Sequence, residues 1–158
     1  MKEQHDSQKD NIGCHQVGSW ASSRAVHNIM VANKSKNTGP EIAVRSALHR
    51  LGLRYRINFR PDPGIRTRAD IVFTRHKVAV NVDGCFWHGC PVHYASPRQN
   101  SSYWAAKVTR NRQRDADVTK ALTEKGWTVM RIWEHVDPTS AAQGIFDSMP
   151  YPQGKIPT

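Results

Sequence analysis

The pattern of hydrophobic and polar positions divides the chain into a polar start, a patterned middle and a short polar end. Residues 1–23 are polar and lack periodicity, so we expect a mobile arm. Residues 24–150 carry helical and strand patterns and are expected to form one domain, followed by a tail at 151–158. Where arm and domain meet, residues 22–32 predict a short helix with Met30 on its apolar side.

The next helix has a recognisable start. Thr38 can cap it, Pro40 lies in its first turn and Glu41 stands three residues after the cap. Apolar residues then recur at helical spacing until Gly52 ends the helix, namely Val44, Ala47, Leu48 and Leu51. Glu41 is the acidic half of a capping box, and it also lies on the side expected to face the core. A second role in a site beside the sheet is therefore compatible with capping.

Three strands are expected after this helix. Residues 53–59 alternate between apolar and polar side chains, which indicates a half-buried strand. Residues 69–73 and 78–83 are two apolar strands joined by a hairpin turn at 74–77. This arrangement places Asp70 inside a strand, where aspartate is disfavoured. We interpret Asp70 as a functional residue, with a cap at the strand end as the alternative.

A long helix is expected from Ser101 or Ser102, as its cap, to Lys125. Its inner face is apolar at helical spacing except in the middle, where Asn111 and Asp115 interrupt it. Buried polar groups need partners, so these two side chains are expected to face a polar site. Exposure through a slight rotation of the helix is the alternative.

A last strand over residues 127–133 and a short helix over 138–148 complete the pattern. The order is helix, three strands, helix and strand. Three consecutive strands followed by a helical crossover to a fourth strand make a mixed sheet with helices packed against it. The sequence therefore predicts a single α/β domain.

Charge and cysteine content narrow the function. The 158 residues include 23 Lys and Arg against 13 acids, a net charge of +10, which favours a polyanionic partner such as nucleic acid. Three cysteines are an odd, sparse set and argue against a disulfide framework. Neither a membrane-spanning apolar run nor the apolar core of a signal peptide is visible. We expect a soluble intracellular protein without membrane contact.

Residues 83–93 combine one carboxylate, two thiols, two imidazoles and two large aromatic rings. Asp70 and Asp83 lie on paired strands, so their carboxylates are expected to converge at one edge of the sheet. Two carboxylates with a histidine, here His88, are what metal-assisted phosphodiester hydrolysis requires. Mg²⁺ prefers oxygen ligands and a histidine can deprotonate water.

The same stretch predicts a zinc site. Cys85, Cys90 and His93 form a C-x4-C-x2-H cluster, and structural zinc normally takes four ligands. His135, just after the last strand, is the preferred fourth ligand, and His88 is the competing candidate. Reduced structural cysteines without metal are the alternative.

At this point the chain resembles a known family. The run Asp-Gly-Cys-Phe-Trp-His-Gly-Cys-Pro-x-His at 83–93 is similar to the very short patch repair (Vsr) mismatch endonucleases, relatives of the PD-(D/E)xK restriction-nuclease fold. The resemblance spans roughly residues 24–137. Supporting matches lie at residues 37–41, 68–70, 103–104, 111, 114–115 and 126–135.

The resemblance implies a restriction-endonuclease-like mixed sheet and a Mg²⁺-dependent enzyme. Such an enzyme nicks one DNA strand beside a T:G mismatch left by deamination of 5-methylcytosine. Asp70 would bind the metal, the Val82 carbonyl would complete its shell, and His88 would be the general base. Glu41 would orient metal-bound water. Asp83 and Asp115 are grouped with these catalytic residues, although Asp83 stands where some relatives have His and its role is open.

The resemblance also implies a structural zinc ion and a DNA-binding surface. The zinc ligands would be Cys85, Cys90, His93 and His135. The residues expected to contact DNA, with the first three as an aromatic wedge at the mismatch, are Phe86, Trp87, Trp104, Met30 and Asn111.

The expected partners are mismatched double-stranded DNA and mismatch-repair proteins. We expect a monomer in the cytoplasm, associated with the nucleoid. Two alternatives remain open at this stage. One is a related nickase with another mismatch or sequence preference, and the other is a non-catalytic zinc module that binds DNA.

Overall fold

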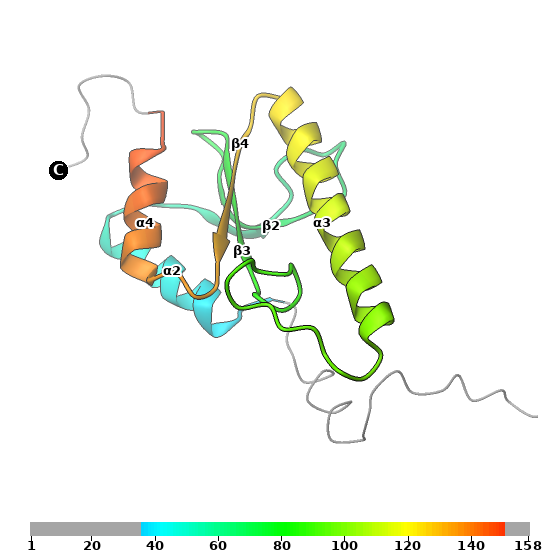
Figure 1. Cartoon of the computed structure of the whole chain (residues 1–158). Helices are drawn as coiled ribbons and strands as arrows, with labels where there is room; N and C mark the ends of the chain where they lie inside the picture. Colours follow the sequence, from blue (N-terminus) through cyan, green and yellow to red (C-terminus); the bar gives the residue numbers. More distant parts are fainter. Residues whose placement is uncertain (1–35, 151–158) are drawn as a thin grey trace, which may run out of the picture. The chain divides into compact units, whose positions relative to one another are not determined.

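The computed structural model describes residues 36–150. The expected arm, the helix at 22–32 with Met30, and the tail lie outside the described residues. No helix within the described range is both long and apolar enough to cross a membrane. The elements, drawn in Figure 1, are α2 (Gly39–Arg50), β1 (Arg56–Phe59), β2 (Ala69–Phe73), β3 (Val78–Asp83), α3 (Ser101–Glu124), β4 (Thr128–Trp133) and α4 (Pro138–Asp147).

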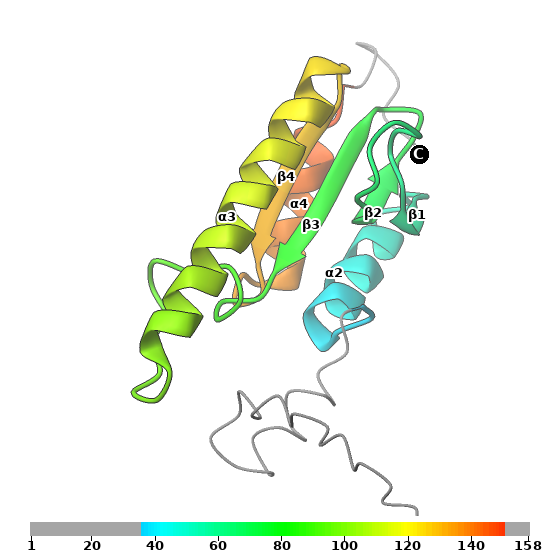
Figure 2. The ribbon, with the colours of Figure 1, turned by 90° about the vertical axis from the view of Figure 1, so that its right-hand side faces the viewer.

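The four strands form one mixed sheet in the order β1-β2-β3-β4. Neighbours β1, β2 and β3 are antiparallel, whereas β3 and β4 are parallel and joined by α3. The predicted mixed α/β fold is confirmed. Asp83 pairs with Trp133 at the end of the parallel pair, so the segments that follow β3 and β4 leave the sheet at the same edge (Figure 2).

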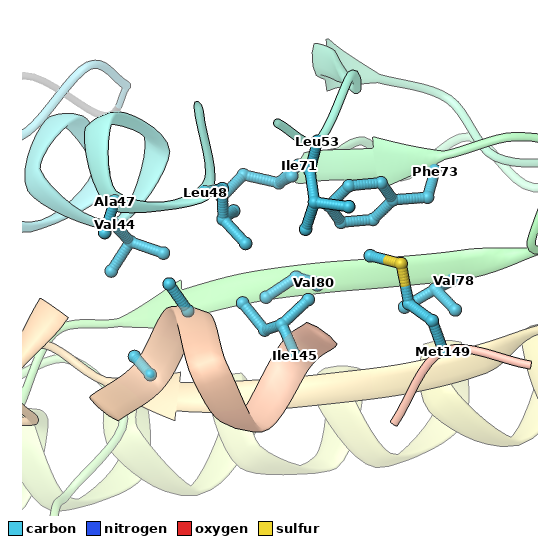
Figure 3. Packing of buried hydrophobic residues seen from close by; sticks show 12 residues of the cluster. Val44, Ala47, Leu48, Leu53, Ile71, Phe73, Val78, Val80, Ile145 and Met149 are labelled. Carbon is cyan, nitrogen blue, oxygen red and sulfur yellow. The ribbon is translucent and has the colours of Figure 1, made fainter. Parts of the chain in front are cut away.

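The helices cover both faces of the sheet (Figure 1). Helices α2 and α4 pack on one face, where Leu48 and Ile145 meet Ile71 and Val80 from the central strands (Figure 3). The alternating positions of those strands contribute to a second cluster with the α3 residue Leu122. Burial of each such side chain stabilises the fold by about 1.5–3 kcal/mol. The two clusters hold α2 on one face of the sheet and α3 on the other.

The first strand is shorter than predicted. β1 begins at Arg56 rather than at residue 53, and Ile57 is 51% exposed instead of half-buried. The physical cause is Asn58, whose φ of 46° interrupts the extended backbone that regular alternation requires. Leu53, before the strand, is buried in the core as predicted.

The two main helices begin differently. Thr38 caps α2 as predicted, with its side chain accepting from the backbone N–H of Glu41, and Gly52 follows the helix with φ 76°. The prediction of a serine cap for α3 is wrong. Ser101 is already helical, and Asn100 stands at the cap position with φ 55° and no side-chain cap hydrogen bond. Asparagine tolerates this left-handed backbone better than most residues.

Candidate functional site

Asp70 on β2 lies at the edge where β3 ends. Its Oδ2 accepts a hydrogen bond of 2.8 Å from the Val82 N–H on the neighbouring strand. Burial raises the pKa of Asp70 to about 6, against the lowering effect of that hydrogen bond. The carboxylates of Glu41 and Asp83 raise this pKa further, and Arg45 lowers it. Acids on α2 and β3 therefore both act electrostatically on Asp70.

Glu41 combines capping with a position beside this cluster. Its Oε1 accepts from the Thr38 hydroxyl at 3.0 Å and its Oε2 accepts from the Asn37 N–H at 2.8 Å. The side chain is buried, and the Arg45 Nη2 lies 3.8 Å from Oε2. Thr38 and Glu41 therefore form only half of the predicted capping box, because the Glu41 carboxylate reaches the N–H of Asn37, one residue before the cap, and Glu41 still acts on the charge of Asp70.

The acidic cluster is suited to a divalent cation. Carboxylate and carbonyl oxygens are the ligands that a hard cation such as Mg²⁺ prefers. Burial of Asp70 together with nearby acids makes ionisation unfavourable, and a bound cation would offset that cost. Asp70, Glu41 and the Val82 carbonyl are the groups that could hold such an ion.

His88 belongs to a network of charges between β3, β4 and α3. Its Nδ1 lies 2.6 Å from the Asp115 Oδ2 and 4.0 Å from the Asp83 Oδ1. The short contact to an ionised carboxylate makes Nδ1 the donor, which leaves Nε2 with the lone pair in the neutral ring. Asp115 therefore meets a polar loop rather than turning to solvent, and its contact determines which ring nitrogen of His88 carries the lone pair.

Arg131 on β4 was missed by the sequence interpretation. Its Nε and Nη2 donate to Asp83 Oδ2 and Oδ1, each at 2.6 Å, and the same Nη2 lies 2.9 Å from Asp115 Oδ2. Asp83 is 5% exposed, so this bidentate pair compensates a buried charge. The available signal was a single arginine within an otherwise mostly apolar final strand.

Helix α3 holds the loop that follows β3. The Asn111 Nδ2 donates to the Trp87 carbonyl at 2.8 Å, and Arg112 donates from Nε to the His88 carbonyl at 2.9 Å and from Nη2 to the Gly89 carbonyl. Gly89 has φ 63°, and a Cβ there would lie 2.6 Å from the Val108 Cγ1. Backbone conformation and close packing both require glycine at this position. Asn111, predicted to contact DNA, supports the loop in this structure.

The structure brings together the four residues predicted to bind zinc. One ligand atom from each of Cys85, Cys90, His93 and His135 lies within 4.8 Å of the others. Cys85 Sγ is 3.1 Å from His135 Nδ1, and Cys90 Sγ is 3.8 Å from both histidine Nδ1 atoms. Tetrahedral zinc, with bonds of about 2.0–2.3 Å, separates its ligand atoms by roughly 3.5 Å. The group can hold a metal ion, and His88 is engaged elsewhere.

The two thiols of this group differ. Burial, together with a hydrogen bond and the charge of Cys90, raises the pKa of Cys85 to about 11. Burial also opposes ionisation of Cys90, but hydrogen bonds from the backbone N–H groups of Val92 and His93 and from Cys85 lower its pKa overall. Glu134, not assigned a role from sequence, accepts from the Cys85 N–H at 2.6 Å and thereby ties this loop to the end of β4.

Aromatic rings gather beside the loop. Phe86 lies 5.2 Å from both Trp87 and Trp104, measured between ring centroids, and the two tryptophans are 5.9 Å apart. The Lys107 Nζ lies 5.3 Å from the Trp87 ring and 5.5 Å from the Trp104 ring. Trp104 is 4% exposed, whereas Phe86 and Trp87 are partly exposed. The buried ring of Trp104 therefore packs against the more exposed rings of Phe86 and Trp87.

The sequence of this chain is similar to those of several known proteins. The family described as "DNA mismatch endonuclease Vsr" matches residues 22–94. The chain is 48% identical over 122 residues to "Type II nicking enzyme V.NaeI" of Lentzea aerocolonigenes, which covers 76% of this chain and 74% of that protein. It is 44% identical over 108 residues to "Type II nicking enzyme V.NmeDIP" of Neisseria meningitidis serogroup C, covering 67% of this chain and 71% of the relative. It is also 30% identical over 106 residues to "DNA mismatch endonuclease Vsr" of Escherichia coli (strain K12), covering 66% of each. The chain belongs to the Vsr family of DNA endonucleases.

Proposed function

We propose that this protein is a Mg²⁺-dependent endonuclease that nicks one strand of duplex DNA next to a T:G mismatch produced by deamination of 5-methylcytosine. The observation that carries the proposal is the acidic cluster around Asp70 at the same strand ends as the His88–Asp115 pair. Relatives named as nicking enzymes and as a mismatch endonuclease support this reaction class. The restriction-endonuclease-like order of elements belongs to the same proposal.

In this mechanism each residue has a separate task. Asp70 and the Val82 carbonyl would hold Mg²⁺, with Glu41 beside them, and the ion would supply neutralisation of the phosphate charge. His88 accepts a proton from the attacking water at Nε2, because Nδ1 is committed to Asp115. Asp115 stabilises the resulting imidazolium. This division explains why a histidine and several acids share one sheet edge.

The Cys and His group serves the fold rather than the reaction. Cys85, Cys90, His93 and His135 would hold Zn²⁺ with four protein ligands, which leaves no open position for substrate. The ion would fasten the loop that carries His88 to the end of β4. Zinc is thus proposed as a structural cofactor and Mg²⁺ as the catalytic one.

Mismatch selection is assigned to the aromatic cluster of Phe86, Trp87 and Trp104. Unstacking a base step costs a few kcal/mol, and a mismatched pair lowers that cost. Base stacking on an aromatic ring returns about 1–3 kcal/mol. Phe86 and Trp87 are the partly exposed members, so they are the first to meet the bases. Asn111 and Met30 are each assigned to contact with DNA.

The proposal extends to the molecular setting of the enzyme. The enzyme acts as a monomer on mismatched DNA in the cytoplasm, at the nucleoid, alongside mismatch-repair proteins. Residues 24–150 form its catalytic domain, with residues 1–23 as an arm and 151–158 as a tail.

The deciding experiment is nicking of a panel of duplexes that carry each mismatch in varied sequence contexts, with and without Mg²⁺. We expect one strand of T:G duplexes to be cut in Mg²⁺, and Asp70→Asn to bind DNA without cutting it. Preference for another mismatch or context would replace the T:G assignment. Failure to nick any duplex or supercoiled plasmid would leave a zinc-containing DNA-binding module instead.

A further inference from the structure

Arg131 occupies a position that the proposed chemistry does not use. Its guanidinium lies between two carboxylates, with Nη2 at 2.6 Å from Asp83 Oδ1 and 2.9 Å from Asp115 Oδ2. The same Nη2 is 3.4 Å from the Nδ1 of His88. That last contact is an approach between two donors, since Nδ1 already donates to Asp115 at 2.6 Å.

The His88 ring has two carboxylates within reach of the same nitrogen. Asp115 Oδ2 lies 2.6 Å from Nδ1 and Asp83 Oδ1 lies 4.0 Å from it, so a modest rotation of the ring would exchange one acceptor for the other. Both oxygens of Asp83 are taken by Arg131 in a bidentate pair. Arg131 therefore engages both oxygens of Asp83 but only one oxygen of Asp115, which leaves Asp115 as the acceptor for His88.

The burial of Asp83 makes its pairing with Arg131 important for the position of His88. Asp83 is 5% exposed, whereas the Arg131 side chain is 28% exposed. A buried carboxylate that lost its arginine would seek another donor, and the His88 Nδ1–H is the donor 4.0 Å away. A ring turned towards Asp83 would no longer present Nε2 in the direction that Asp115 sets.

We infer that Arg131 and Asp83 form a charge clamp that positions His88 for its reaction, with Arg131 as a positioning residue. The clamp rests on the proposed function, because it acts through the base that function assigns. It assigns Asp83 a structural task at this site, as the partner of Arg131 rather than a group that acts on the substrate. A misplaced catalytic group commonly reduces the rate by one to two orders of magnitude.

The first test compares Arg131→Met with Arg131→Lys on the substrate that the wild type cuts. For Arg131→Met we expect kcat to fall by about tenfold or more, because the ring of His88 then has two acceptors. Lysine keeps the charge but lacks the bidentate fork, so Arg131→Lys should fall between the wild type and Arg131→Met. Arg75→Met, the same change in the exposed turn at the opposite end of β3, should leave kcat unchanged.

The second test is the double variant Asp83→Asn/Arg131→Met. It restores the local charge balance and removes the competing carboxylate, so stability and kcat should recover from the values of Arg131→Met. KM should change less than kcat across the series, because the clamp acts on His88 and not on the bound DNA. A merely structural role would restore stability in the double variant without separating kcat from KM.

A readout independent of nicking is the tautomer of His88, measured from the ¹⁵N shifts of its ring nitrogens at fixed pH in the zinc-containing protein. The wild type should show the Nδ1–H form, and Arg131→Met should show averaged or broadened ring signals. Wild-type kcat in a folded Arg131→Met protein, a double variant as slow as that single variant, or Arg131→Lys equal to the wild type would each overturn the clamp. Absence of nicking by the wild type would overturn the proposed function instead, and the ring signals would still test the clamp.

Discussion

Ionisation of Asp70 carries an electrostatic cost, which makes the stability of the fold depend on pH. Burial raises its pKa from 3.8 to about 6, and the nearby Glu41 and Asp83 add to that shift. The carboxyl is therefore more stable protonated in the folded protein than in the unfolded chain. Its favourable contribution to stability is fully present below pH 3.8 and is lost as the pH rises through about 6.

This sign gives a prediction for Asp70→Asn, which cannot ionise at this position. In magnesium-free buffer that retains zinc, the wild type should lose stability relative to Asp70→Asn by roughly 1–3 kcal/mol between pH 5 and pH 7.5. Urea unfolding of both proteins at the two pH values measures this difference. Adding Mg²⁺ at pH 7.5 should stabilise the wild type and leave Asp70→Asn unchanged.

Asp62→Asn provides the control for that measurement. A backbone hydrogen bond from Gly64 and the contact with Lys125 lower the pKa of Asp62, so its transitions lie below pH 5. The stability difference between Asp62→Asn and the wild type should be flat over the same interval. A flat difference for Asp70→Asn as well would contradict the assignment of a costly charge at Asp70.

Gly89 gives a second prediction at the scale of one residue. Gly89→Ala should destabilise the protein by about 1–3 kcal/mol, because φ is 63° and the added Cβ would lie 2.6 Å from Val108. Nicking should slow as well, since the His88 carbonyl next to it is held by α3. Gly144→Ala in α4 has nothing within 4 Å and should be neutral or stabilising in the same unfolding assay.

At the scale of elements, the loop between β3 and α3 depends on groups supplied by the end of β4. Cys85 and Cys90 come from the loop, and His135 and Glu134 come from the segment after β4. Regular secondary structure is absent from residues 84–100, so cross-links must fix the loop. A metal with four ligands fixes a loop by adding its binding energy to the folded state.

We predict one zinc ion per chain, lost in Cys90→Ser and in His135→Ala. Both variants should unfold less cooperatively, and metal analysis of the purified proteins measures the loss. His88→Ala is the matched control, because His88 lies in the same loop but bonds to Asp115, and it should retain zinc. Full zinc content and full stability in His135→Ala would show that the fourth ligand is another group.

The sequence predicted those features that depend on local patterns. The Thr38 cap, the hairpin between β2 and β3 and the apolar face of α3 follow from spacing along one segment. Arg131 could not be placed in the same way, because its partners lie 48 residues earlier on β3 and 16 residues earlier on α3. The pairing of Arg131 with Asp83 depends on the register between the parallel strands β3 and β4. The hydrophobic pattern of a single strand does not determine that register. The exposure of Ile57 depended on the unusual φ of Asn58, which the alternation concealed.

At the scale of the whole molecule, attraction to DNA and discrimination between duplexes depend on different features. The net charge of +10 attracts any DNA, because phosphate contacts carry no sequence information. Discrimination between duplexes then requires a feature that responds to base pairing. Phe86 and Trp87, backed by the buried Trp104, are the candidates for that feature.

We predict that Trp87→Ala loses discrimination between T:G and paired duplexes while overall DNA affinity changes little. The stacking energy of about 1–3 kcal/mol corresponds to roughly a 5- to 150-fold loss of preference. The measurement is relative cleavage of matched and mismatched duplexes at fixed salt by folded protein. Unchanged discrimination in both Trp87→Ala and Phe86→Ala would exclude insertion of these rings between bases.

The parallel pairing of β3 with β4 also bears on the stage of protein synthesis at which the chain can first cut DNA. The hairpin of β2 and β3 joins neighbours in the chain, whereas the contacts of Asp83 with Arg131 and of Cys85 with His135 span 48 and 50 residues. Closing long loops is entropically harder than closing short ones, so local contacts form first. A chain still leaving the ribosome contains Asp70 and His88 before it contains Arg131 and His135, which contact the end of β3 and the loop after it. We therefore expect the cutting activity to be acquired only after synthesis has passed β4.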